Sequence, residues 1–399
     1  MQDVEPRSAS GRPEVPASAY VPTLDGWRAV AILWVMACHS QGQLFGPAGI
    51  FPNRFLARSA ERGTFGVDLF FALSGLLICS RLLAAWRADG RIDFAGFYLR
   101  RAWRILPPYF LYLATIGLLW AAGVVALDPL AYASCFAFLR NYIPEPYMSS
   151  DPFTAHAWSL SVEEHFYLIW PALLGLLATV PRARRVAFGL AITSIGWSFL
   201  DINLRLTTRY LHLPINHHYW RTDYSIGGLL LGCWMALLLD DPARRERLRL
   251  RLSPAAWFAL LAVFLWLATS VRENAARALA APIVPLLLAG TLLHPAGLAG
   301  RVLEWAPLRW VGRISYSLYL WQQLFLIPPT ASRPLGRLHD FPVAWIAAFA
   351  CALASYHLVE RPAMALGRRL SRRRRRPVPP AGLIRRPHFE RPSVGSRPV

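Results

Sequence analysis

Ten apolar segments of the 399-residue chain set the strongest limit on its fold, because each has a length suited to crossing a membrane. A helix of about 20 apolar residues spans a hydrocarbon core of about 30 Å. Only 17% of the residues are charged, against about 25% in soluble domains. The sequence thus excludes a soluble enzyme, a secreted disulfide scaffold and a disordered chain. It predicts an all-α integral membrane protein with about ten transmembrane helices. The expected spans are Leu24–Phe45, Phe65–Leu83, Ile105–Leu127, Trp158–Val180, Val186–Leu200, Trp220–Leu239, Ala255–Val271, Ala278–His294, Ile314–Thr330 and Phe341–Val359.

The distribution of basic residues predicts the orientation of these spans. All 43 basic residues are arginine. With a cytoplasmic N-terminus, 32 arginines fall on the inner side and 11 on the outer side, as the positive-inside rule favours. Leaving out the 12 arginines from Arg361 onward still gives 20 against 11. Both termini are therefore expected in the cytoplasm.

The chain is expected to have three parts. Residues 1–22 are polar and proline-rich, and residues 363–399 are rich in arginine and proline, so both are predicted to be disordered cytoplasmic tails. Residues 23–362 form the predicted membrane domain. The basic C-terminal tail is expected to attract anionic lipid headgroups. Nucleic acid is not expected as a partner, because no aromatic residues are interleaved with the arginines.

Ionisable residues inside the predicted spans are functional candidates, because a charge within the bilayer costs several kcal/mol. Arg28 and His39 are eleven residues apart, which on a helix is about 16 Å of rise and about 20° of rotation, so they share one face. For Arg28, snorkelling of the side chain to the inner headgroups is about as good an explanation as a functional role. Snorkelling explains His39 poorly. For His39 the alternative is a neutral histidine that is hydrogen-bonded to a neighbouring helix. Several polar residues lie on the outer side of their spans with His39. This predicted outer layer consists of His39, Asp68, Glu163, Arg221 and Asp223.

A second polar layer is predicted at the inner surface. Arg101 and Arg104 are three residues apart and would share a helical face, and Arg28 and Glu360 lie at the same level. An arginine cluster facing the cytoplasm suits a phosphorylated donor. A histidine beside a carboxylate in the outer layer suits general-base chemistry on a hydroxyl. The sequence contains no nucleophile elbow, phosphate-binding loop or dinucleotide-binding motif.

Other polar residues have structural explanations. Ser161 and Glu164 fit a capping box at the start of the fourth span. The five cysteines lie in apolar segments without paired spacing, so they are predicted to be small buried hydrophobes. No metal site is expected, because His212, His217 and His218 share one outer loop without nearby cysteine or carboxylate ligands.

Seven motifs, in the same order, resemble those of the acyltransferase 3 family of integral-membrane acyltransferases. The resemblance covers residues 23–362, and the order of the motifs is more specific than any one of them. The motifs are Thr23–Arg28 followed by His39, Gly66–Gly75, Phe97–Pro107, Trp158–Glu164, Arg221–Asp223, Gly312–Trp321 and Tyr356–Pro362.

The resemblance implies a membrane O-acyltransferase. Family members transfer an acyl group, usually acetyl from acetyl-CoA, to a hydroxyl of a sugar, a glycan or a glycosylated small molecule. The implied partners are an acyl-CoA, a sugar or glycan acceptor and membrane lipid, without a resident cofactor. The implied location is the bacterial cytoplasmic membrane, where the chain would be a multi-pass protein.

The resemblance also implies roles for particular residues. The family's arginine–histidine pair corresponds to Arg28 and His39, its Arg-x-x-Arg motif to Arg101 and Arg104, and its late glutamate to Glu360. The three arginines would bind the donor.

The working hypothesis is that His39 deprotonates the acceptor hydroxyl while Glu163 or Asp68 orients its ring. Two residues depart from the family pattern. Gln322 stands where many members carry histidine, and His165 replaces the more usual glutamine.

Two other functions are compatible with parts of the sequence. A transporter or flippase for a lipid-linked or acylated sugar would use the same polar layers as a pathway, but such proteins often carry an internal repeat. The motifs of the first half do not recur after residue 200. A membrane scaffold that recruits a partner through its arginine tail would leave His39, Asp68 and Glu163 unexplained.

Overall fold

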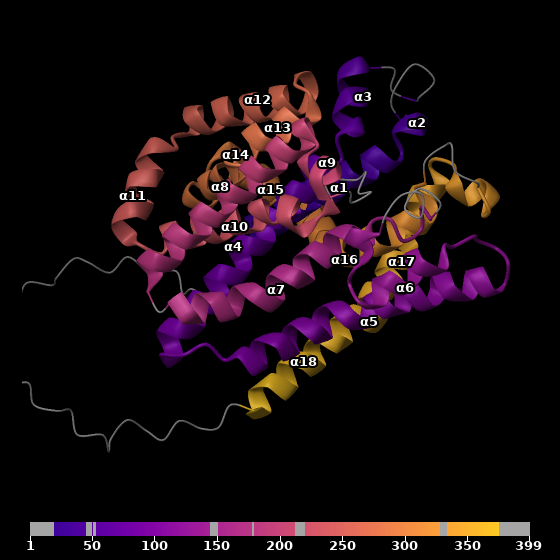
Figure 1. The fold of residues 1–399 in the computed structure, drawn as a ribbon, viewed down its shortest axis with the longest axis horizontal. Coiled ribbons are helices and arrows are strands. Elements are labelled where there is room, and N and C mark those ends of the chain that lie inside the picture. Colours follow the sequence, from indigo (N-terminus) through magenta and orange to yellow (C-terminus); the bar gives the residue numbers. More distant parts are fainter. Residues whose placement is uncertain are drawn as a thin grey trace, which may run out of the picture.

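The computed structural model describes residues 20–44, 50, 53–143, 151–177, 179–211, 220–327 and 333–374. The described residues form helices and no strand, which confirms the predicted all-α class (Figure 1). Both predicted tails lie mainly outside the described residues, as do His212, His217 and His218. The helices are α1 Pro22–His39, α2 Gln41–Leu44, α3 Arg54–Glu61, α4 Thr64–Asp89, α5 Phe94–Ala121, α6 Pro129–Phe136, η1 Arg140–Tyr142, α7 Ala157–Leu177, α8 Val180–Leu204, α9 Leu206–Leu211, α10 Thr222–Leu239, α11 Pro242–Arg251, α12 Pro254–Ser270, α13 Glu273–Ala280, α14 Ile283–Leu293, α15 Leu298–Leu303, α16 Ala306–Phe325, η3 Gly336–His339, α17 Val343–Ser355, the π-helical turn η4 Tyr356–Glu360, and α18 Arg361–Arg374.

Several helices have the length and composition of membrane spans. Among the described residues, five are long and apolar enough, and the number rises to seven if two bent helix pairs each count as one span. The five are Thr64–Asp89, Phe94–Ala121, Val180–Leu204, Thr222–Leu239 and Val343–Arg372. The expected total of ten and the cytoplasmic termini stay predictions.

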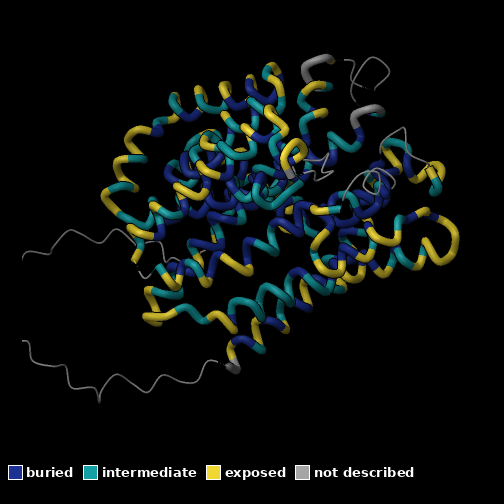
Figure 2. Tube along the Cα trace, in the orientation of Figure 1, coloured by how far each residue is buried: buried dark blue, intermediate teal, exposed yellow. Residues whose placement is uncertain are grey.

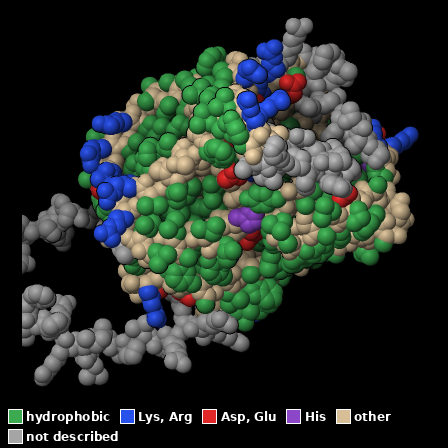
Figure 3. Space-filling model, viewed as in Figure 1, with side chains coloured by type: hydrophobic (Ala, Val, Ile, Leu, Met, Phe, Trp, Pro, Cys, Tyr) green, Lys and Arg blue, Asp and Glu red, His purple; other side chains and the backbone are tan. Residues whose placement is uncertain are grey.

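The outer faces of the bundle are apolar. Leu168, Leu176 and Leu358 are each more than two-thirds exposed, and Figure 2 shows such exposed positions surrounding a buried centre. Figure 3 shows hydrophobic side chains over much of one face and arginines along the edge formed by α11. A soluble protein rarely exposes so much apolar surface, so this distribution suits a chain surrounded by lipid.

A close seam joins α4 to α10 in the centre of the bundle. A Cβ atom added at Gly75 would lie 1.9 Å from the carbonyl oxygen of Leu229, and one at Gly232 would lie 2.2 Å from that of Ala72. Small residues allow helix backbones in a membrane to approach in this way. At the end of the same pair, Arg87 forms a 2.6 Å ion pair with Asp240.

The C-terminal helix is longer than expected. Residues 363–374 were assigned to the disordered tail, but they belong to α18, which packs along α5. A Cβ atom at Gly367 would lie 2.6 Å from the Cβ of Trp103, and Arg100 donates a hydrogen bond to Ser371. The arginine-rich composition did not predict this helix, because the helix is stabilised by packing against α5, which composition does not report.

Candidate active site

A cavity of about 90 Å³ lies between α1, α4, α5, α7 and α16. Its most distinctive feature is the charge of its lining, which comes from four arginines and one carboxylate. Two of the arginines lie on the same face of α5 because they are three residues apart. These five charged residues are Arg28, Arg81, Arg101, Arg104 and Glu163.

Glu163 is held by several donors at the wall of this cavity. Ser74 donates to its Oε1 at 3.0 Å, and Tyr167 donates to its Oε2 at 2.5 Å. Arg101 approaches the same carboxylate at 3.4 Å, while its guanidinium lies 3.4 Å from the centre of the Tyr167 ring. Glu163 therefore belongs with the arginines, and its predicted place in an outer layer with His39 is wrong.

The arginines of the cavity are only partly neutralised. Arg28 pairs with Asp25 at 3.0 Å, and Arg101 pairs with Glu163. Arg81 and Arg104 form neither an ion pair nor a hydrogen bond with any residue that the structure describes. The cavity thus carries an excess positive charge in the interior of the helical bundle. Guanidinium groups bind phosphate oxygens in a bidentate manner, so this lining suits a polyanionic ligand.

His39 is the last residue of α1, although the predicted span continued to Phe45. Its Nδ1 lies 2.8 Å from Oε1 of the buried Gln322. The Gln322 amide nitrogen is directed at the Tyr319 carbonyl oxygen at 3.5 Å and at Oε1 of Gln323 at 3.2 Å. These contacts orient the amide so that its oxygen accepts a hydrogen bond from Nδ1–H. The Nε2 atom of His39 then carries the lone pair that can accept a proton.

The expected partner of His39 is therefore replaced by another. No contact joins His39 to Glu163 or Asp68, and the ring is oriented by the neutral Gln322. Gln322 lies one helical turn beyond Tyr319, which lines the arginine cavity. One turn is about 5.4 Å, so His39 contacts α16 about one turn from the cavity-lining Tyr319. The sequence marked Gln322 only as a departure from the family pattern.

Asp68 and Glu360 have structural partners away from this cavity. Asp68 makes a bidentate ion pair with Arg277 of α13, at 2.7 and 3.0 Å. Glu360 is buried at the end of η4 and accepts a hydrogen bond from Ser317 at 2.7 Å. It lies within electrostatic range of Arg104. Glu360 therefore lies near Arg104 without lining the cavity, whereas Asp68 joins α4 to α13.

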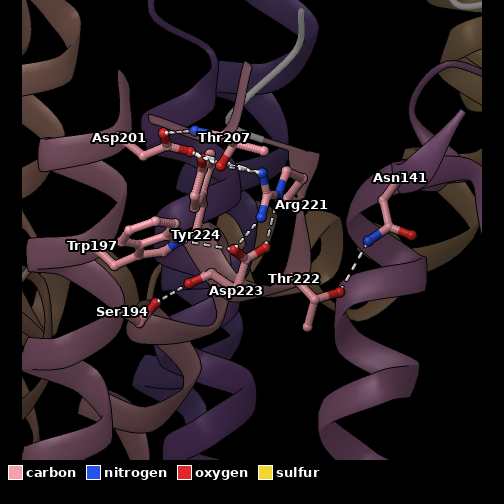
Figure 4. A network of polar contacts seen from close by, with 9 residues as sticks. All are labelled: Asn141, Ser194, Trp197, Asp201, Thr207, Arg221, Thr222, Asp223 and Tyr224. Carbon is pink, nitrogen blue, oxygen red and sulfur yellow. Dashed lines mark hydrogen bonds and ion pairs between the residues drawn. The ribbon is translucent and has the colours of Figure 1, made fainter. Parts of the chain in front are cut away.

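Arg221 and Asp223 belong to a closed network between α8, α9 and α10 (Figure 4). Arg221 contacts both carboxylate oxygens of Asp223, at 2.6 and 3.0 Å, and lies 3.8 Å from Asp201. Trp197 also donates to Asp223 at 3.0 Å, and the backbone N–H of Thr207 donates to Asp201 at 2.6 Å. None of the five lines the arginine cavity. Their arrangement is that of an internal brace.

The predicted capping box at Ser161 and Glu164 is not formed. Helix α7 begins at Ala157, four residues before Ser161, so Ser161 lies inside the helix and donates to the Ala157 carbonyl oxygen at 3.0 Å. Glu164 instead lines a second cavity, of about 300 Å³, together with His165 and Arg101. The turns at Asp151–His156 lead directly into α7, and the sequence pattern did not predict this earlier helix start.

The helical fold and the apolar outer faces define a class of protein: a polytopic membrane protein, here with an internal cavity whose lining is cationic. A family model for the acyltransferase domain of the acyltransferase 3 family matches residues 21–357. The chain belongs to this family. The match confirms the resemblance inferred from its seven motifs.

Curated relatives are similar over most of the chain. A putative peptidoglycan O-acetyltransferase YrhL of Bacillus subtilis is 30% identical over 89% of this chain and 56% of its own length. The peptidoglycan O-acetyltransferase OatA of Listeria monocytogenes is 26% identical over 86% of this chain and 56% of its own. For the O-acetyltransferase OatA of Staphylococcus aureus the values are 24%, 86% and 57%. The chain thus spans just over half the length of these relatives. No solved structure matches it.

Proposed function

We propose that the protein is a membrane O-acyltransferase that moves an acyl group, acetyl in the first instance, from acyl-CoA to a hydroxyl of a glycan. The observation that carries this proposal is the contact of His39 with Gln322, which lies one helical turn along α16 from the cavity-lining Tyr319. Two guanidinium groups of that cavity have no partner among the described residues. Family membership and the names of the relatives supply the reaction class. A polysaccharide acceptor is proposed because two of those names specify peptidoglycan.

The arginine cavity is proposed to bind the phosphates of the donor. Arg81 and Arg104 would contact phosphate oxygens directly, because neither has a protein partner among the described residues. Arg28 and Arg101 would add to the field while Asp25 and Glu163 hold them in position. Arg28 and His39 are about 16 Å apart along α1, a distance that the extended arm of a coenzyme A thioester can bridge.

His39 is proposed to act as the general base. Its Nε2 takes the proton of the acceptor hydroxyl as the oxygen attacks the thioester carbonyl carbon. Collapse of the tetrahedral intermediate breaks the carbon–sulfur bond, and the coenzyme A thiolate takes up the proton from the imidazolium. Gln322 keeps the reactive tautomer because it accepts from Nδ1–H. General-base catalysis of this type contributes about 10²- to 10⁴-fold to a rate.

The finer topology belongs to the same proposal. Ten spans with both termini in the cytoplasm would place the arginine cavity toward the side where acyl-CoA is made. The ends of α4 and α10, joined by Arg87 and Asp240, and the arginine-rich α11 would then face the cytoplasm. The protein would lie in the bacterial cell membrane.

The experiment that tests the function measures donor turnover. Protein in lipid nanodiscs is mixed with acetyl-CoA and either an N-acetylglucosamine trisaccharide or a muramyl disaccharide, and free thiol and acetylated sugar are followed together. We expect equal yields of both products, and loss of both in His39→Gln. Arg104→Gln is tested in the same assay. Its matched control is Arg249→Gln, because Arg249 pairs with Glu246 at the surface of α11. Absence of acetyl-CoA binding by the folded wild-type protein would overturn the donor assignment.

A further inference from the structure

His156 is a second buried histidine beside the proposed site, and its ring has unused hydrogen-bonding capacity. The residue is only 4% exposed. Neither ring nitrogen has a hydrogen-bond partner in the described part of the chain. A buried polar group left unpaired costs about 1–3 kcal/mol. Such a group therefore calls for an explanation, such as a catalytic role or a bound water, ion or ligand.

The ring of His156 is held in place by packing. Tyr112 and Tyr319 contact it edge-on, with centroid distances of 5.3 and 5.5 Å. The backbone carbonyl oxygen of His156 accepts hydrogen bonds from Tyr319 at 3.0 Å and from Ser159 at 3.2 Å. The surrounding structure therefore fixes the ring while leaving both nitrogens for other groups.

The same face of α16 holds His156 and His39. Tyr319 contacts His156, and Gln322, one turn further along, contacts His39. Gln323 then donates to the Pro152 carbonyl oxygen at 2.7 Å, which ties the segment before His156 to α16. The two imidazoles therefore contact α16 side chains that are three residues apart, about 4.5 Å of helical rise. Ser159 and Tyr319, which bond to the His156 backbone, also line the arginine cavity.

We propose that His156 binds a second hydroxyl of the acceptor, next to the one that His39 deprotonates. A neutral imidazole offers one N–H donor and one lone pair, which match the donor and acceptor of a sugar hydroxyl. His156 thereby fixes which hydroxyl of a polyhydroxylated ligand reaches His39. This inference rests on the proposed acyl transfer and adds a residue that selects and orients the acceptor.

Two variants of His156 test this role, one that keeps an aromatic ring and one that keeps polar groups. His156→Phe keeps the aromatic packing against Tyr112 and Tyr319 but removes both nitrogens, whereas His156→Gln keeps a donor and an acceptor. We expect His156→Phe to raise the KM for the trisaccharide at least tenfold while the affinity for acetyl-CoA stays unchanged. His156→Gln is expected to recover part of this loss. The matched control is His294→Phe. His294 is a half-buried histidine whose ring contacts the Arg249 carbonyl oxygen.

Each outcome of the kinetic experiment has a meaning. An unchanged acceptor KM in folded His156→Phe would overturn the proposal. Equal losses of donor affinity and acceptor affinity in both variants would also overturn it, because they indicate a structural role alone. If the wild-type protein shows no acyl transfer to any acceptor, the proposed function fails instead.

A second measurement does not require that His156→Phe folds. The histidines are labelled with ¹³C at Cε1, and the His156 signal is assigned by its loss in His156→Gln. Addition of the N-acetylglucosamine trisaccharide to the turnover-blocked His39→Gln protein is expected to shift this signal and leave that of His294 in place. A His156 signal that does not move at saturating trisaccharide would contradict acceptor binding.

Discussion

Two clusters of charged residues lie within the helical bundle, and they differ in how completely their charges are paired. In the network around Arg221, the guanidinium is bonded to Asp223 and faces Asp201, and further donors fill the remaining carboxylate positions. In the arginine cavity, Arg81 and Arg104 have no such partner among the described residues. Both clusters contain the same residue types in an apolar setting. Charge at membrane depth therefore identifies a candidate, and the pairing decides whether it braces the fold or receives a ligand.

The largest effect is expected at His39. His39→Gln removes the lone pair of Nε2 and should lower acyl transfer by about 10²- to 10⁴-fold. The melting temperature should change little, because the ring makes one side-chain hydrogen bond, to Gln322. Product formation and thermal unfolding are measured on the same preparation. Turnover within threefold of wild type would contradict the general-base role.

Arg221→Gln should break the other side of the comparison. Removing one partner of a buried ion pair leaves the other charge uncompensated, at a cost of about 3–5 kcal/mol. Asp201 is fully buried, so we expect a clear fall in the free energy of unfolding. Turnover per folded molecule should stay near wild type. Loss of turnover with unchanged stability would place Arg221 in the active site.

Arg104→Gln should give the opposite pattern. One hydrogen bond to a charged group is worth about 1.5–3 kcal/mol, and 1.4 kcal/mol corresponds to tenfold in affinity. We therefore expect acetyl-CoA to bind about 10- to 100-fold more weakly. Stability should be unchanged or higher, because a repulsion with Arg28, Arg101 and Arg81 is relieved. The dissociation constant and the unfolding temperature are measured together, and a destabilised protein with normal donor affinity would refute the assignment.

The smallest effect is expected for Arg249→Gln on α11. Its ion pair with Glu246 is at the surface, and such pairs contribute about 0–1 kcal/mol. Donor binding, turnover and unfolding should all lie close to wild type. A change in donor affinity as large as that of Arg104→Gln would show that net charge, rather than the cavity, controls binding.

The sequence predicted those parts of the site that depend on spacing within one helix. Arg101 and Arg104 face the same cavity because residues three apart share a helical face. The pairing of Arg101 with Glu163 joins α5 to α7, and no local pattern reports such a contact. For the same reason, the sequence suggested a carboxylate as the partner of His39 and did not identify Gln322.

Helix boundaries were the least predictable part of the fold. The cap expected at Ser161 failed because α7 begins at Ala157. The tail expected from residue 363 failed because α18 packs against α5 through Gly367. For α18 the deciding contacts come from a distant segment, α5, whereas for α7 they come from the turns that lie just before the helix. The all-α class was more robust, since it rests on the length and apolarity of many segments together.

The glycine seam between α4 and α10 has a consequence for how the protein could adapt to new substrates. Gly75 follows the cavity-lining residue Ser74, and its backbone is pressed against Leu229. This wall cannot shift without separating two helices, so it acts as a fixed reference surface. Helix α16 has an equally close seam, to α1, because a Cβ atom at Gly312 would lie 1.8 Å from the carbonyl oxygen of Asp25, whereas the described glycines of α5 and α7 meet only side chains. Changes in specificity should therefore accumulate on α5 and α7 while the α4 and α16 walls keep their positions.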